Sequence, residues 1–68
     1  MTDEEKIKFV NRVFECESQV YASSGKRYDY QTEFWFHKYL SKGEFDEDSN
    51  KKNLDVAYQI ALNLNKDK

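Results

Sequence analysis

The chain has no proline and only two glycines, Gly25 and Gly43, among its 68 residues. Turns between strands depend on these two residue types, so their scarcity argues against an all-β chain. The two glycines instead divide the sequence into three segments that are long enough for helices. We therefore expect an all-α protein, a small three-helix bundle that forms one domain over residues 1–68.

Cysteine and histidine are equally scarce, because Cys16 and His37 are the only residues of their types. A single cysteine excludes an intramolecular disulfide and suits a reducing compartment. Nucleophilic catalysis would need a cysteine or serine beside His37 with a third orienting group, whereas Cys16 falls among apolar positions where cysteines are usually inert. We expect no metal, no cofactor and no enzymatic activity.

Long apolar runs are also missing. No window approaches the roughly 18 apolar residues of a membrane-spanning helix, and the N-terminus lacks the basic and apolar stretches of a signal peptide. We therefore expect a cytoplasmic protein that does not enter a membrane. The formal net charge of −2 and the absence of Lys and Arg between Leu54 and Asn65 argue against nucleic acid as a partner.

An acidic segment before the third expected helix superficially matches a calcium-binding loop. Asp46, Asp48 and Asn50 have the spacing of the first ligands. The match ends there, because Lys51 stands where the loop needs glycine and Ala57 where it needs glutamate. The segment is better explained as an acidic helix entry, where the helix dipole favours carboxylates.

Local signals place the ends of the helices. Thr2 and Glu5 have the spacing of a capping box, Asp29 can serve as an N-cap, and Gly25 and Gly43 can end helices in the left-handed conformation. The expected helices cover about residues 3–22, 30–42 and 50–65.

Residues 28–36 leave a second possibility open. Aromatic and polar residues alternate there with the period of a half-buried strand. We prefer a helix, because a strand needs a neighbour and the chain has no second segment of strand character. Pairing with a strand of another chain would still permit the alternative.

Glu17 is a charge in the middle of an apolar arc on the first expected helix. A buried carboxylate without a partner is strongly disfavoured. We therefore interpret Glu17 as a structural buried charge that pairs with a lysine, an arginine, a tyrosine hydroxyl or the imidazole of His37. The alternative is a functional carboxylate with a raised pKa. Its neighbours one turn away are Val13, Phe14, Val20 and Tyr21.

The second expected helix holds a concentration of aromatic residues that a helix must divide between two sides. One side carries Thr32, Trp35, Phe36, Tyr39 and Leu40, and the other carries Tyr30, Phe34 and His37. One side should face the bundle, and the Tyr30 side is then a candidate contact surface. If this helix were instead central, between the other two, both sides would be buried.

The third expected helix is apolar over about two thirds of its circumference, more than a three-helix bundle normally buries. This excess predicts self-association into a homo-oligomer or docking on a larger protein partner. We expect a small regulatory protein-binding module, an inhibitor or adaptor that occludes a partner's surface through the aromatic helix. The predicted anchors are Tyr30, Phe34, Trp35 and His37.

Two alternatives stay open. The first is a small-ligand or nucleotide binder whose pocket forms between subunits, and the second is an acidic mimic of nucleic acid. The ligand site would draw on Lys26, Arg27, Tyr28, Tyr30 and Trp35.

Overall fold

The structure, a computed structural model, describes residues 2–45 and 51–66. Within these ranges the chain forms three helices, α1 (Asp3–Ser24), α2 (Tyr30–Lys42) and α3 (Lys51–Lys66). The predicted all-α, three-helix architecture is confirmed. The strand alternative for residues 28–36 is wrong, because the described ranges contain no strand and α2 begins at Tyr30. The acidic segment 46–50 and the predicted start of the third helix at residue 50 lie outside the described residues.

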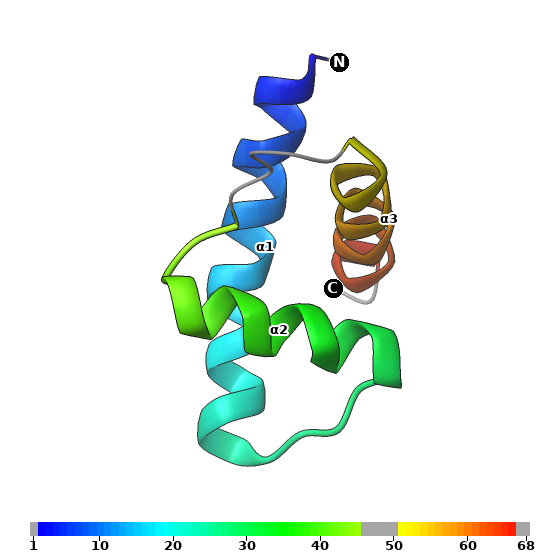
Figure 1. Cartoon of the computed structure of the whole chain (residues 1–68). Helices are drawn as coiled ribbons and strands as arrows, with labels where there is room; N and C mark the ends of the chain where they lie inside the picture. Colours follow the sequence, from blue (N-terminus) through cyan, green and yellow to red (C-terminus); the bar gives the residue numbers. More distant parts are fainter. Residues whose placement is uncertain (1, 46–50, 67–68) are drawn as a thin grey trace.

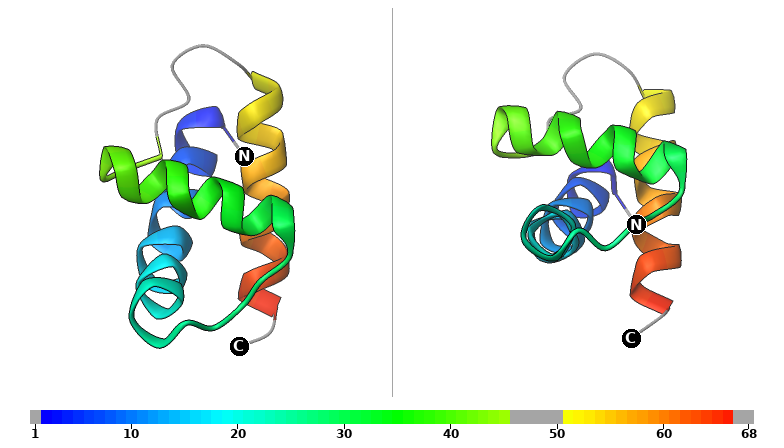
Figure 2. Two further views of the ribbon diagram at one scale, coloured as in Figure 1. Left: turned by 60° about the horizontal axis from the view of Figure 1, so that its bottom comes forward. Right: turned by 90° about the horizontal axis from the view of Figure 1, so that it is seen from below.

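α1 is the element on which the other two helices pack (Figure 1). α3 lies alongside α1, and α2 crosses α1 so that the first turn of α2 comes near α3 (Figure 2). No helix in the described part of the chain is both long and apolar enough to cross a membrane.

The helix ends follow the local signals of the sequence. The Glu5 N–H donates to the Thr2 hydroxyl at 3.2 Å, and the Thr2 N–H donates to the Glu5 carboxylate at 3.2 Å, which completes the predicted capping box. Gly25 and Gly43 follow α1 and α2 with φ values of 75° and 84°. A side chain at these positions would be strained, so glycine is favoured at both helix ends.

The hydrophobic core lies where the three helices meet. Phe14 of α1 and Phe36 of α2 are fully buried, and their rings meet edge to face with centroids 5.5 Å apart. Such aromatic pairs stabilise a fold beyond the area that they bury. The buried hydrophobic residues are Val10, Val13, Phe14, Trp35, Phe36, Phe45, Leu54, Ala57, Ile60 and Ala61.

The buried stripe of α1 is narrower than its apolar arc. It follows one helical face through Val10, Val13, Glu17 and Ser18, all of which are buried together with Phe14. Cys16 lies off this stripe and is exposed, so its expected place among buried apolar residues is wrong.

Asn11 fastens the segment after α2 to α1, a contact that the sequence did not predict. Its amide oxygen accepts the Phe45 N–H at 2.7 Å, and its amide nitrogen donates to the Phe45 carbonyl at 3.0 Å. The same nitrogen also donates to the Ile7 carbonyl at 3.0 Å. One side chain thus satisfies both backbone groups of Phe45, whose ring reaches the core.

Replacing Asn11 by alanine should lower the free energy of unfolding by about 1–3 kcal/mol, because both backbone groups of Phe45 would lose their partner. Urea denaturation followed by circular dichroism measures the change. Asn63→Ala is the matched control, since Asn63 is exposed within α3 and should change stability by less than about 0.5 kcal/mol. Equal effects of the two substitutions would contradict the role of Asn11.

Candidate functional site

The two sides of α2 have different environments. Thr32, Trp35 and Phe36 are buried on the side that faces the core. On the other side, Tyr30 is 88% exposed, Phe34 is 46% exposed and His37 is also exposed. These three residues are called the α2 ridge below. A central α2 buried on both sides is therefore wrong.

One predicted anchor is buried, and one residue of the side expected to face the bundle is exposed. Trp35, a predicted anchor, is not on the ridge but in the core, where its ring centroid lies 5.9 Å from that of Phe45. Leu40, expected on the buried side, is exposed. The structure therefore places Tyr30, Phe34 and His37 on one exposed side of α2, and the buried Trp35 ring packs edge to face against Phe34 with centroids 5.5 Å apart.

A hollow of about 340 Å³ adjoins the ridge, and we call it the α2 hollow. It extends from the ridge to the end of the loop that connects α1 to α2. Its walls combine aromatic rings with an arginine and a carboxylate. The lining residues are Arg27, Tyr30, Glu33, Phe34 and His37.

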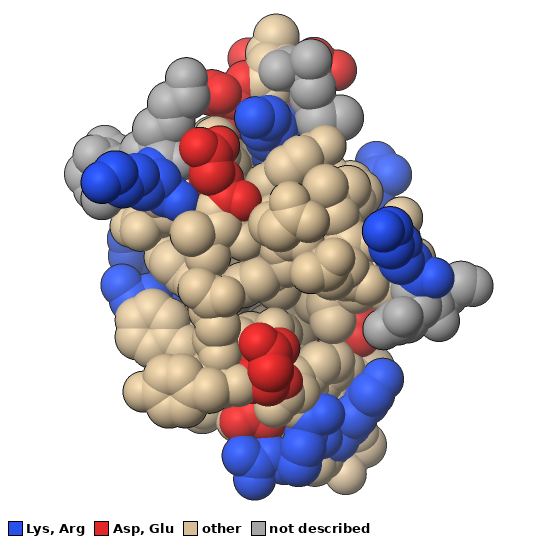
Figure 3. Space-filling view, turned by 90° about the vertical axis from the view of Figure 1, so that its right-hand side faces the viewer, with Lys and Arg blue, Asp and Glu red and all other residues tan. Residues whose placement is uncertain are grey.

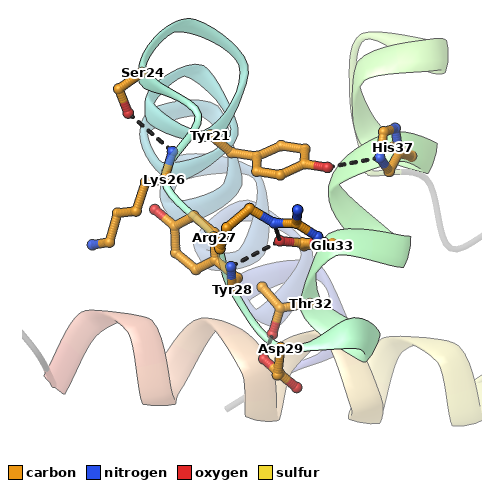
Figure 4. A network of polar contacts seen from close by, with 9 residues as sticks. All are labelled: Tyr21, Ser24, Lys26, Arg27, Tyr28, Asp29, Thr32, Glu33 and His37. Carbon is orange, nitrogen blue, oxygen red and sulfur yellow. Dashed lines mark hydrogen bonds and ion pairs between the residues drawn. The ribbon is translucent and has the colours of Figure 1, made fainter.

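An ion pair at the start of α2 positions one wall of this hollow (Figure 4). The Arg27 guanidinium donates to the Glu33 carboxylate through Nε and Nη2, both at 2.8 Å, and the Tyr28 N–H donates to the same carboxylate at 2.8 Å. These bonds hold the pKa of Glu33 at about 2, with the Arg27 hydrogen bond as the largest cause and the Tyr28 N–H as the next. The Glu33 carboxylate in turn raises the pKa of Arg27.

The Glu33 contacts should make stability depend on acid. Because the folded-state pKa of Glu33 lies below its ordinary value of 4.5, its contribution is present above that value and is lost as pH falls toward about 2. The stability difference between the wild type and Glu33→Gln should therefore shrink over this window. Thermal unfolding followed by circular dichroism at several pH values measures it.

Glu15→Gln is the control for general acid effects, because Glu15 is exposed on α1. In Glu15→Gln, the loss of thermal stability between pH 4.5 and about 2 should be the same as in the wild type. A stability difference for Glu33→Gln that stays constant down to pH 2 would contradict the assignment.

Tyr28 joins this loop to the buried carboxylate of Glu17. The Tyr28 hydroxyl donates to Glu17 Oε1 at 2.8 Å, and its ring packs edge to face on Phe36 with centroids 4.9 Å apart. Burial, followed by the hydrogen bond to Glu17, raises the pKa of Tyr28 to about 12. Glu17 is only 7% exposed, and a tyrosine hydroxyl is one of the partners that its burial required.

Tyr28→Phe should lower the free energy of unfolding by about 1–3 kcal/mol, because the buried Glu17 carboxylate loses this donor. The matched control is Tyr30→Phe, which removes the same hydroxyl from an exposed ring and should cost less than about 0.5 kcal/mol. Chemical denaturation measures the free energy of unfolding of both variants. Similar losses in the two would contradict the stabilising role of the Tyr28–Glu17 hydrogen bond.

An alkaline titration of phenolate absorbance gives an independent readout of the same pair. The latest tyrosine to ionise should do so near pH 12 and should be missing from Tyr28→Phe. Since the pKa is raised, the associated stability is complete below the ordinary value of 10 and is lost as pH rises toward 12.

His37 contacts Tyr21 of α1. The Tyr21 hydroxyl and His37 Nε2 are hydrogen-bonded at 2.9 Å, and the two rings meet edge to face with centroids 5.5 Å apart (Figure 4). An exposed histidine with a fixed partner is an oriented part of the surface. The α2 ridge is therefore tied to α1 through His37 and to the preceding loop through Glu33.

Within one chain, the residues of the predicted ligand site do not line a common hollow, and a pocket between subunits stays a prediction. Arg27 and Tyr30 line the α2 hollow, whereas Lys26 Nζ lies over the Tyr28 ring, 5.1 Å from its centroid. Tyr28 lines a different hollow of about 400 Å³, and Trp35 lines neither of these two. The second hollow lies between the start of α2 and α3 and is lined by Tyr28, Asp29, Gln31, Thr32, Val56, Gln59, Ile60, Asn63 and Leu64.

Among the described residues, no three side chains of His, Cys, Asp or Glu come together as ligands for a metal ion. Sequence reasoning also missed Glu33, which organises the loop, because its partner Arg27 lies six residues earlier and outside the helix. Helical spacing rules apply only within a helix, so no pattern connects the two.

Asp29 precedes α2 as predicted, but its carboxylate accepts a hydrogen bond from the Thr32 hydroxyl and caps no backbone N–H.

No family model, curated protein or solved structure matches this chain.

Proposed function

We propose that this protein is a regulatory protein-binding module, of the inhibitor or adaptor type, that docks on a larger protein through the α2 ridge. The observation that carries the proposal is the exposure of two aromatic rings, Tyr30 and Phe34, on a helix whose other side is buried. Burying such rings contributes strongly to association, and tyrosine is common among interface hot spots.

The contacts that connect α2 to the preceding loop and to α1 support a role of the ridge in binding. A surface that is ordered before association loses less conformational entropy when it binds. Glu33 ties the first turn of α2 to the loop, and the hydrogen bond of His37 ties the third turn to Tyr21. Lys38 borders the ridge with its Nζ 5.3 Å from the centroid of the Phe34 ring, and an aromatic centre with a polar rim is typical of interfaces.

A second surface supports self-association into a homo-oligomer, which we propose through α3. Four of its apolar side chains are only partly buried. Figure 3 shows a broad uncharged area on the side of the molecule that contains α3 and the start of α2. The partly buried apolar side chains of α3 are Val56, Tyr58, Leu62 and Leu64.

We also propose a cytoplasmic location, since the exposed thiol of Cys16 suits a reducing compartment.

One observation favours small-ligand binding as a second candidate function. The hollow between α2 and α3 is lined by apolar side chains such as Ile60 and by the amides of Gln31, Gln59 and Asn63. Amides can donate and accept, so they can recognise a neutral polar ligand. A mimic of nucleic acid has no comparable support, because the net charge of −2 is far from that of a phosphate backbone.

The decisive experiment compares partner recovery by immobilised wild type, Phe34→Ala and Leu40→Ala from an extract of the source cells. A partner bound through the ridge should bind Phe34→Ala roughly 30-fold more weakly, the loss typical of a hot-spot residue. Leu40→Ala should bind normally, because Leu40 is exposed on α2 but belongs to neither the ridge nor its hollow. Circular dichroism establishes that each variant is folded.

Unchanged recovery by folded Phe34→Ala would overturn the docking proposal. Sedimentation of the free wild type over a series of protein concentrations measures self-association. A monomer mass at all concentrations would overturn the homo-oligomer proposal.

A further inference from the structure

The α2 hollow presents flat surfaces whose charges are already satisfied. The guanidinium of Arg27 and the carboxylate of Glu33 neutralise each other, and Nε2 of His37 is bonded to the Tyr21 hydroxyl. Tyr30 and Phe34 add two aromatic rings to the walls. A ligand of this hollow would therefore meet π-faces and ring edges, and the Lys38 ammonium, 5.3 Å from the centroid of the Phe34 ring, is not among the lining residues.

The guanidinium of Arg27 is held in one orientation. Two parallel N–H···O bonds fix its plane relative to the Glu33 carboxylate, and the Tyr28 N–H fixes that carboxylate. The Arg27 side chain is nevertheless 80% exposed, so the pairing leaves most of it uncovered. A guanidinium plane stacks well on aromatic rings, which an ammonium group does not reproduce.

We propose that the α2 hollow binds one aromatic side chain of the protein partner, a tryptophan or tyrosine, stacked on the Arg27 guanidinium between Tyr30 and Phe34. This inference rests on the proposed docking function and specifies the chemistry that the partner must present. A volume of about 340 Å³ is at the lower end of small-molecule sites, which fits a single ring system.

Charge and stacking favour an aromatic occupant over other side chains. An anionic side chain would meet an Arg27 charge that Glu33 already neutralises, and a cationic one would meet a Glu33 carboxylate that Arg27 already neutralises, so neither finds an uncompensated opposite charge in the lining. An aliphatic side chain would gain apolar contact but no stacking energy. Aromatic pairs gain both.

The test uses N-acetyltryptophanamide as the probe, titrated into the full chain and followed by two-dimensional proton–nitrogen NMR. We expect saturable shifts concentrated at Arg27, Tyr30, Phe34 and His37. N-acetylleucinamide is the aliphatic control and should produce no saturable shifts at these positions. Adenosine monophosphate is the control for a nucleobase with a phosphate.

Variants separate stacking from charge and from general packing. Arg27→Lys keeps the positive charge but removes the planar face, so it should weaken binding of N-acetyltryptophanamide by about twofold to tenfold. Tyr30→Ala should weaken it similarly, and Tyr30→Phe, which keeps the ring, should recover most of the binding lost in Tyr30→Ala. Leu40→Ala is the surface control and should also bind normally.

Several results would overturn the inference. These are equal binding of the leucine probe, tighter binding of adenosine monophosphate, or Arg27→Lys that binds like the wild type. Shifts at the hollow on simple dilution of the free protein would also overturn it, since they would place a second copy there. The probe is tested without the partner, so a negative result leaves the ridge proposal to its own experiment with Phe34→Ala.

Discussion

The Glu33 carboxylate accepts three hydrogen bonds from the loop that precedes α2, two from the Arg27 guanidinium and one from the Tyr28 backbone. These bonds set the path of the chain into α2. They place the Tyr28 ring against Phe36 in the interior and its hydroxyl on Glu17. The same bonds leave Arg27 at the surface as a wall of the α2 hollow, so one carboxylate organises both the core side and the solvent side of this loop.

The arrangement around α1 explains why so short a chain retains exposed aromatic surface. α2 and α3 each pack on α1 and make little contact with each other. A helix that packs on a single neighbour buries one face, so the opposite face of α2 stays in solvent. The ridge of Tyr30, Phe34 and His37 is that face.

Most of the fold was predictable because its signals are local. The capping box of Thr2 and Glu5 and the left-handed Gly25 and Gly43 act within a few residues of each helix end. The division of the α2 aromatics into two sides also follows from helical periodicity alone. The candidate site was predictable only in part, since Trp35 proved to be a core residue and Glu33 went unrecognised.

Local signals in the sequence were enough for the helical class and for the ends of α1 and α2, because backbone propensity, capping and periodicity are properties of neighbouring residues. Which side chains of each face are covered, and which polar groups meet, depends on how the helices pack together. Glu17 finds Tyr28 eleven residues later, and Asn11 finds Phe45 thirty-four residues later, through contacts that depend on how the helices cross. Such pairings follow from packing in three dimensions, which no periodicity along a single helix encodes.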